Sequence, residues 1–270
     1  MALPYSFHLT VNEAAFLFQL MGIPEGDSLP VIFGANATKE TVFTDQQRLI
    51  RQLEEAGLLK SDEKDITLES GLLNLLQACK YSSAVLLLQS SSLVSRFSVS
   101  YAFISGGQIV RLTWNSTAVK VVLSSFQASL EELLSQVGDE LQLPDVTAKD
   151  YRICLQPVTL KQLQEQWVTK NANAYESILR SDPSAQTEAP AVASLLQSCH
   201  SIEQWGTFDA VIRGTELRSQ TVYFIGSTAA NWIFIQNGEG LMQGYSLTEP
   251  ELIQTLYLIA AGTLKVLSPV

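Results

Sequence analysis

Histidine is scarce in this sequence, and its scarcity restricts the chemistry that the chain can perform. Only two histidines, His8 and His200, occur among the 270 residues. A metal centre or an imidazole-dependent triad must use one of them or do without. His200 directly follows Cys199, yet no further Cys or His stands at ligand spacing. We therefore expect no metal, no cofactor and no catalytic residues.

The familiar reactive motifs are also missing. The sequence has no Gly-x-Ser-x-Gly, no Walker loop and no His-Glu-x-x-His. Gly238-Glu239-Gly240 lacks the third glycine of a dinucleotide-binding loop and precedes a further strand, so it predicts a hairpin. Carboxylate pairs such as Glu54-Glu55 and Glu131-Glu132 are typical of solvated helix faces. The sequence therefore favours a protein that is not an enzyme.

Basic residues are outnumbered by acidic ones. The chain has 17 Lys and Arg against 27 Asp and Glu, which gives a net charge of -10. No basic stripe interrupts this excess, so the phosphate backbone of a nucleic acid would be repelled. We expect no nucleic-acid partner.

Long apolar runs and cysteines are few. The longest apolar run, Thr255 to Val266, is shorter than the roughly 20 residues of a spanning helix, so no membrane span is expected. The segment Met1 to Leu9 lacks the charged start and apolar core of a signal peptide. Cys79, Cys154 and Cys199 stand far apart among apolar neighbours, which is typical of reduced thiols, with a single Cys79–Cys199 bridge as the alternative. We expect a soluble cytoplasmic protein.

What the chain does contain is an internal repeat. The sequence Leu75-Leu76-Gln77-Ala78-Cys79 recurs 120 residues later as Leu195-Leu196-Gln197-Ser198-Cys199. Strand-like runs and then a helix-like segment follow each copy. The period exceeds the roughly 20 to 50 residues of solenoid repeats. We therefore expect two related halves, 1–146 and 147–270, in one compact body whose 46% hydrophobic residues can build a large core.

The first half begins with a clear helix signal. Thr10 and Glu13 have the spacing of a capping box and predict a helix over 11–21 that ends at Gly22. Further helices are expected at 44–58, 68–79 and 130–141, with a short strand at 31–33 and a charged turn at 61–64. A Gly106-Gly107 turn joins two strands of an antiparallel meander that is expected at 84–89, 97–105, 108–114 and 118–124.

The second half repeats this plan. Helices are expected at 159–179, 191–199 and 250–264, a mobile surface loop at 181–190, and strands at 208–214, 220–226, 231–236 and 241–246. Asn237-Gly238 predicts a type I′ turn, in which both central residues need positive φ. The pattern predicts an α+β fold of two pseudo-symmetric halves, each with helices, an antiparallel β-meander and a C-terminal helix.

Aromatic and apolar residues supply the candidates for partner contact. Trp114 and Trp232 fall in expected strands and are typical of core anchors, with an interface role as the alternative. Trp205 is expected in a loop before a strand. The first hairpin could reach out of the body to contact a partner, although an apolar hairpin flank is usually core. Its candidate residues are Phe103, Ile104, Gly106, Gly107, Ile109 and Val110.

The order of several motifs resembles the EspG family. These motifs are Leu9 to Leu17, Gln47-Arg48-Leu49 through Gly57-Leu58-Leu59, the strand at Arg96 with its hairpin, and Gly206-x-Phe208 through Thr221 to Ser227. The resemblance follows the chain over nearly its whole length. The short Ser105-Gly106-Gly107 loop departs from the family pattern and marks a distant relative.

The resemblance implies a cytosolic, non-enzymatic chaperone of type VII secretion with two α+β halves around a central antiparallel sheet. Such a chaperone shields helical-hairpin substrates of the PE/PPE-like or WXG type. The implied contacts are the hairpin from Phe103 to Val110 and the last helix, at Leu252, Leu256 and Ile259. Two alternatives stay open: a small-molecule-binding or regulatory module with a cleft between the halves, and a hydrolase assembled from Ser, Asp and His200. The oligomeric state also stays open.

Overall fold

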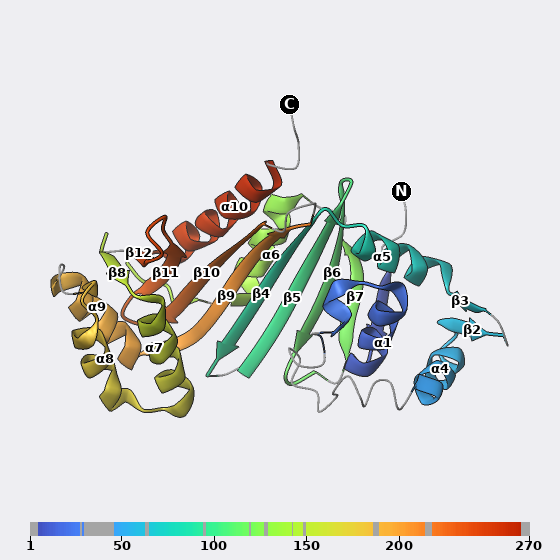
Figure 1. Cartoon of the computed structure of the whole chain (residues 1–270), viewed down its shortest axis with the longest axis horizontal. Coiled ribbons are helices and arrows are strands. Elements are labelled where there is room, and N and C mark those ends of the chain that lie inside the picture. Colours follow the sequence, from blue (N-terminus) through green and yellow to red (C-terminus); the bar gives the residue numbers. More distant parts are fainter. Residues whose placement is uncertain are drawn as a thin grey trace. The chain divides into compact units, whose positions relative to one another are not determined.

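The chain folds into two compact units (Figure 1). The first comprises residues within 1–87, 95–128 and 211–218, and the second comprises residues within 88–94, 129–210 and 219–270. The expected division at residue 146 differs, since the helix at 130–141 groups with the second unit and 211–218 with the first. The computed structural model describes residues 5–27, 29, 46–62, 65–93, 96–118, 120–126, 129–141, 143–147, 150–185, 189–213 and 218–265.

The first unit combines helices with an antiparallel meander. Its strands lie in the order β1-β7-β6-β5-β4, and α5 packs on β5, β6 and β7. A separate pair, β2 and β3, is also antiparallel. The elements are β1 (Ser6–Leu9), α1 (Val11–Met21), η1 (Pro24–Asp27), α4 (Gln46–Glu55), β2 (Leu59–Ser61), β3 (Ile66–Leu68), α5 (Ser70–Lys80), β4 (Ala84–Ser92), β5 (Arg96–Ser105), β6 (Gln108–Asn115) and β7 (Val121–Phe126).

The second unit also combines helices with an antiparallel meander. Its strands lie in the order β9-β10-β11-β12-β8, and α10 packs on α6 and β11. The elements are α6 (Leu130–Leu141), β8 (Arg152–Leu155), α7 (Pro157–Thr169), η2 (Ala172–Ala174), α8 (Tyr175–Ser181), α9 (Ala189–His200), β9 (Ile202–Ile212), β10 (Arg218–Ser227), β11 (Asn231–Gln236), β12 (Met242–Leu247) and α10 (Glu249–Lys265). The α+β class with antiparallel sheet structure is confirmed, and the pseudo-symmetry of the halves stays a prediction.

Local sequence signals explain the start of the chain. The Thr10 hydroxyl accepts a hydrogen bond from the Glu13 amide, and the Glu13 carboxylate accepts one from the Thr10 amide. This capping box satisfies two amides that the first turn of α1 leaves without helical partners. Gly22 ends the helix in the left-handed region at φ 67°, as the sequence predicts.

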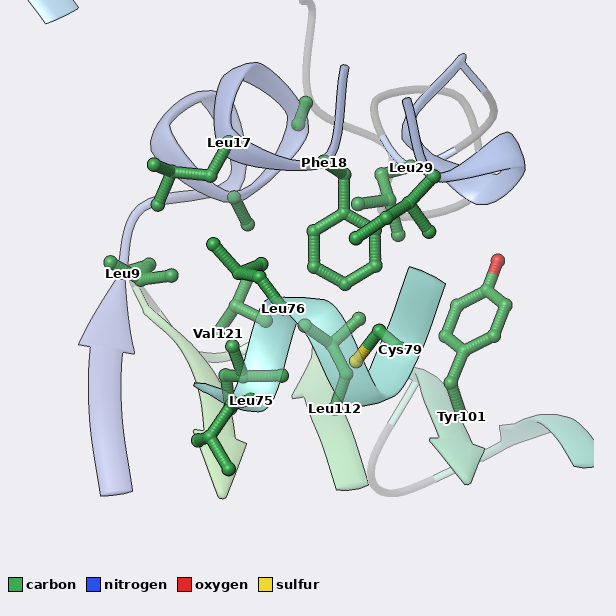
Figure 2. Packing of buried hydrophobic residues seen from close by; sticks show 14 of the residues in the cluster. Leu9, Leu17, Phe18, Leu29, Leu75, Leu76, Cys79, Tyr101, Leu112 and Val121 are labelled. Atoms are coloured by element: carbon green, nitrogen blue, oxygen red, sulfur yellow. The ribbon is translucent and has the colours of Figure 1, made fainter. Parts of the chain in front are cut away.

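Each unit has its own core, and the repeated motif lies in both. Leu75, Leu76 and Cys79 of α5 face Phe18 and Leu112 in the first core (Figure 2). Leu195 and Cys199 of α9 take part in the second core, where they join Trp205 and Trp232. All three cysteines are free thiols, so the alternative Cys79–Cys199 bridge is wrong.

Several expected elements differ in the structure. The helical stretch at 159–179 is broken at Lys170, which adopts a positive φ of 57°. The Thr169 hydroxyl donates back to the Glu165 carbonyl, and the Asn171 side-chain amide donates to the Gln166 side-chain carbonyl. These local polar bonds compete with a continuous helix.

The expected mobile surface loop at 181–190 is anchored at its start. Asp182 and Ala185 are buried. The Asp182 carboxylate accepts hydrogen bonds from the amides of Gln156 and Ser184. A side chain that satisfies two backbone amides holds this part of the loop in place, and α9 already begins at Ala189.

The expected type I′ turn at Asn237-Gly238 is wrong. Neither residue has a positive φ, which belongs instead to Gly240 at 80°. The Asn237 side chain accepts hydrogen bonds from the amides of Glu239 and Leu241, so an Asx-type loop replaces the two-residue turn. Trp205 is also corrected, since it lies fully buried within β9 rather than in a loop.

Two further expectations concern short segments. The strand expected at 31–33 lies outside the described residues. The charged turn expected at 61–64 overlaps the end of β2 at Ser61, and residues 63–64 lie outside the described part.

Candidate interaction surfaces

The tip of the β5–β6 hairpin is an exposed two-residue turn. Ser105 pairs with Gln108 across the hairpin, and Gly106 and Gly107 adopt φ values of 53° and 86°. Two successive residues with positive φ match the right-handed twist of the flanking strands, and glycine accepts this backbone without strain. The turn expected from the Gly106-Gly107 pair therefore forms, and both glycines are exposed.

The flanks of this hairpin point largely into the core. Phe103, Ile109 and Val110 are buried, whereas Ile104 is half-buried. The Phe103 ring packs edge-on against Phe18 at a centroid distance of 5.8 Å. Because strand residues alternate between faces, Phe103 shares its face with the buried Tyr101. Of the hairpin residues predicted to contact a partner, the structure leaves Ile104, Gly106 and Gly107 accessible.

Tyr81 lies beside this hairpin and was not identified from the sequence. It follows the last residue of α5 and is 70% exposed. Its carbonyl accepts a hydrogen bond of 3.4 Å from the Ser105 hydroxyl, and the Lys80 ammonium lies 5.7 Å from its ring centre. Its pairing with the hairpin depends on tertiary structure, so sequence periodicity gives no signal for it. We call Tyr81, Ile104, Gly106 and Gly107 the hairpin surface.

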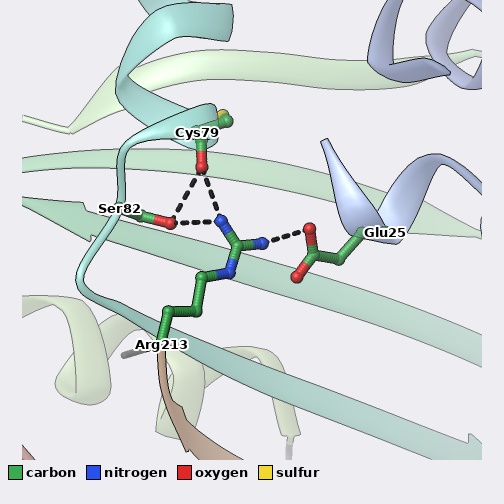
Figure 3. A network of polar contacts seen from close by, with 4 residues as sticks. All are labelled: Glu25, Cys79, Ser82 and Arg213. Carbon is green, nitrogen blue, oxygen red and sulfur yellow. Dashed lines mark hydrogen bonds and ion pairs between the residues drawn. The ribbon is translucent and has the colours of Figure 1, made fainter. Parts of the chain in front are cut away.

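A polar network fixes the turn that carries Tyr81. The Arg213 guanidinium donates to the Cys79 carbonyl at 2.8 Å and to the Ser82 hydroxyl at 2.7 Å, and it forms an ion pair with Glu25 (Figure 3). A cation at the C-terminus of α5 is favourable because the last helical carbonyls carry partial negative charge. The network therefore holds the end of α5 in one position.

The backbone continues this connection to the hairpin. The Arg213 amide donates to the Ser83 carbonyl, and the Ser83 amide donates to the Ile104 carbonyl. The Arg213 guanidinium also lies 5.7 Å from the Phe103 ring centre. Arg213 thus links the turn at the end of α5 to the strand that leads to the hairpin tip.

The other predicted contact element, α10, presents a different face from the expected one. Leu252 and Leu256 are fully buried, and Ile259 is half-buried. Leu258 is 59% exposed. The spacing of Leu252, Leu256 and Ala260 forms the inward stripe of an amphipathic helix, so the accessible residues lie on the remaining faces. Whether α10 contacts a partner stays a prediction.

Helices line several grooves in the second unit. An open groove of about 950 Å³ lies between α7 and strands β10 to β12, lined among others by Lys161, Gln164, Thr221 and Tyr223. A groove of about 430 Å³ lies between α6 and α10. The described residues that line these two grooves include no histidine and no cysteine.

Burial shifts the pKa of several titratable groups among the described residues. Burial raises the pKa of the Cys79 thiol, with the nearby Glu25 adding to the effect and Arg213 opposing it. Burial alone raises the pKa of Cys199 to about 12. His200 packs edge-on against Tyr175 at 5.5 Å, and burial raises the pKa of that tyrosine to about 12. Both buried thiols are protonated at neutral pH and therefore poor nucleophiles.

The described part of the chain contains neither a metal-binding cluster nor a membrane-spanning helix. No cluster of three or more His, Cys, Asp and Glu side chains that could hold a metal ion occurs among the described residues. Within those same residues, no helix has both the length and the apolar character to cross a membrane.

Comparison with known proteins identifies a fold. No protein-family model matches the chain, and no curated protein matches it in sequence. Among solved structures, the chain is similar to the Mycobacterium tuberculosis type VII secretion system chaperone EspG5, whose structure was determined in complex with a PE25-PPE41 dimer. The two share 12% sequence identity over 96% of each chain with a TM-score of 0.64. The chain therefore has an EspG-like fold, as the order of its motifs suggested.

Proposed function

We propose that this chain is a non-enzymatic cytoplasmic chaperone that binds and shields helical substrates of a type VII secretion system. The observation that carries the proposal is the EspG-like fold over 96% of the chain, because a solved protein with that fold is a chaperone in complex with a PE-PPE pair. The partners proposed here are helical-hairpin proteins of the PE/PPE-like or WXG type.

The hairpin surface supports this proposal physically. It combines an exposed aromatic ring with a glycine turn whose backbone a partner can approach closely. Tyrosine is enriched at the centres of protein interfaces, where its ring is buried and its hydroxyl finds a partner. The Arg213 network holds the turn that carries this ring before any partner arrives, so little conformational freedom is lost on binding.

The direct test is co-expression of the chain with a PE/PPE-like pair of helical secretion substrates from the same organism. Light scattering on a sizing column should show one species whose mass equals the chain plus the substrate pair. Without the chain, the substrate pair should aggregate. A substrate pair that stays soluble alone and never co-elutes with the chain would contradict the proposed function.

Two variants then test whether the hairpin surface contacts the substrate. Tyr81→Glu should weaken the complex, because a carboxylate cannot be buried cheaply at an apolar contact. Val168→Glu is the matched control, since Val168 is 67% exposed on α7, far along the chain from the hairpin surface. Equal affinities for the two variants would leave the chaperone role intact and remove Tyr81 from the interface.

A further inference from the structure

The groove between α6 and α10 is lined by both apolar and acidic residues. Among the apolar lining residues, Leu134 is buried, and Ile253 and Tyr257 of α10 are half-buried. The two helices approach closely because Gly138 has no side chain. A Cβ atom at this position would lie 3.1 Å from the Ile253 side chain. The result is a shallow concavity of about 430 Å³.

Three carboxylates line this groove. Glu131 and Asp139 lie on α6 in one stripe with Ser135, at intervals of four residues, and Glu249 stands at the start of α10. No Lys or Arg belongs to the described lining. The two helices contain six carboxylates and one lysine, a net charge of -5 that is half of the net charge of -10 of the whole chain.

Helix stability explains only part of this charge. Glu131 and Glu249 lie in the first turns of their helices, where a negative charge is favourable. Asp139 lies in the last turn of α6, where the helix dipole disfavours a negative charge and the turn contains no basic residue. An acidic residue kept at an unfavourable helix position beside an apolar concavity points to an external partner.

We propose that the α6–α10 groove binds an amphipathic partner helix that carries Lys or Arg on both sides of its apolar stripe. The apolar side chains would enter over Leu134 and Ile253, and the cations would face Glu131, Asp139 and Glu249. An apolar centre with a charged rim is the usual anatomy of a protein interface, and complementary charge sets the choice of partner. The inference rests on the proposed function in taking this helix to belong to the shielded substrate.

Two synthetic peptides test the groove on the full-length chain. Both are 20-residue amphipathic helices with the same leucine stripe, flanked by lysine in one and by glutamate in the other. NMR titration of the labelled chain should place the lysine peptide on α6 and α10, with an affinity at least about ten-fold above that of the glutamate peptide. Equal binding of both peptides, or binding of the lysine peptide outside these helices, would overturn the inference.

A charge-reversed variant provides the second test. Glu131→Lys, Asp139→Lys and Glu249→Lys together should invert the preference between the peptides. The matched control is Glu55→Lys, Glu203→Lys and Glu239→Lys, which changes the net charge equally at three exposed positions outside the groove. The control should keep the preference of the original chain. A control that inverts the preference as well would reduce the effect to net charge and overturn the inference.

The substrate complex separates this inference from the proposed function. If the substrate pair co-elutes with the original chain and the groove variant releases it at least about ten-fold more readily than the control variant, both stand. If the pair binds all three proteins equally, the groove inference fails and the chaperone role remains. If the peptides discriminate but no secretion substrate binds, the groove stands and the proposed function fails.

Discussion

The two units place the same kind of helix end beside a buried cysteine but satisfy the polar groups there by different means. In the first unit, the end of α5 at Cys79 is held by Arg213, which is paired with Glu25. In the second unit, the end of α9 at Cys199 is held by uncharged groups. A repeated apolar motif therefore determines where the helix packs, whereas each unit uses different polar groups to satisfy the end of that helix.

In the second unit, the uncharged contacts at the end of α9 depend on the Ser198 hydroxyl. The Ser198 side chain is fully buried, and its oxygen accepts a 3.0 Å hydrogen bond from the Trp232 indole. Its proton can be donated to the Ser194 carbonyl at 3.0 Å or to the Ala230 carbonyl at 3.3 Å. In the first copy of the repeat the same position is Ala78, so the hydroxyl belongs to the second unit alone.

The largest effect is expected from breaking the ion pair between Arg213 and Glu25 at the end of α5. Arg213→Met should lower the free energy of unfolding by about 3 kcal/mol, because it leaves Glu25 largely buried without its cation. Urea denaturation followed by circular dichroism measures this loss. The double variant with Glu25→Gln should recover a large part of it, since no uncompensated charge remains. A double variant no more stable than Arg213→Met would show that the ion pair is not the cause.

A somewhat smaller effect is expected from filling the close approach at Gly206 of β9. Gly206 of β9 stands where the first copy has Leu86. A Cβ atom at Gly206 would lie 2.5 Å from the Gln89 carbonyl oxygen and still closer to the Phe224 ring. Gly206→Ala should therefore cost about 2 kcal/mol through overpacking. Thermal unfolding checks this value, with Gly238→Ala as the control, since nothing lies within 4 Å of a Cβ atom there.

Replacing Ser198 with alanine, the residue at the equivalent position in the first copy of the repeat, should have a moderate effect. Ser198→Ala should cost about 1.5 kcal/mol, because it leaves the buried Trp232 indole N–H without its acceptor. The double variant with Trp232→Phe measures the coupling between the two side chains. Strictly additive losses in that cycle would show that the hydrogen bond contributes nothing to stability.

The smallest effect is expected from lowering the pH until Glu69, the N-cap residue of α5, becomes protonated. The Glu69 carboxylate accepts hydrogen bonds from the first turn, chiefly the backbone amides of Gly71 and Leu72, and they lower its pKa below the ordinary value of 4.5. A carboxyl with a lowered folded-state pKa stabilises the protein above its unfolded pKa and loses this contribution as the pH falls through the folded value. Below about pH 4.5, the protein should therefore lose a few tenths of a kcal/mol more stability than Glu69→Gln does, a small loss because the carboxylate is only half-buried and solvent screens it. Identical acid profiles for the two proteins would contradict this assignment.

Local signals made much of the fold predictable. The capping box at Thr10 and Glu13, the glycine pair at the hairpin tip and the helical period around Cys79 each specify their element within a few neighbouring residues. The short strands β1 and β8 could not be predicted, because four residues show no alternation and each strand forms only by pairing with a distant partner. The Asn237-Gly238 pair misled because the asparagine side chain bonds the loop backbone instead.

The candidate surfaces were predictable only in outline. The sequence located the hairpin, yet the same alternation that makes β5 a strand places Phe103 on the core side. It located α10 but assigned contact to Leu252 and Leu256, which form the inward stripe. Tyr81 and the acidic groove depend on which elements meet in space, and periodicity along one segment carries no such information.

Hydrogen exchange of the chain with and without a co-expressed helical secretion substrate tests the central claim most directly. The account predicts slower exchange of backbone amides at the hairpin surface around Gly106 and Gly107, and in α6 and α10, when the substrate is bound. Exchange that is unchanged in all three segments while a stable complex forms would contradict it.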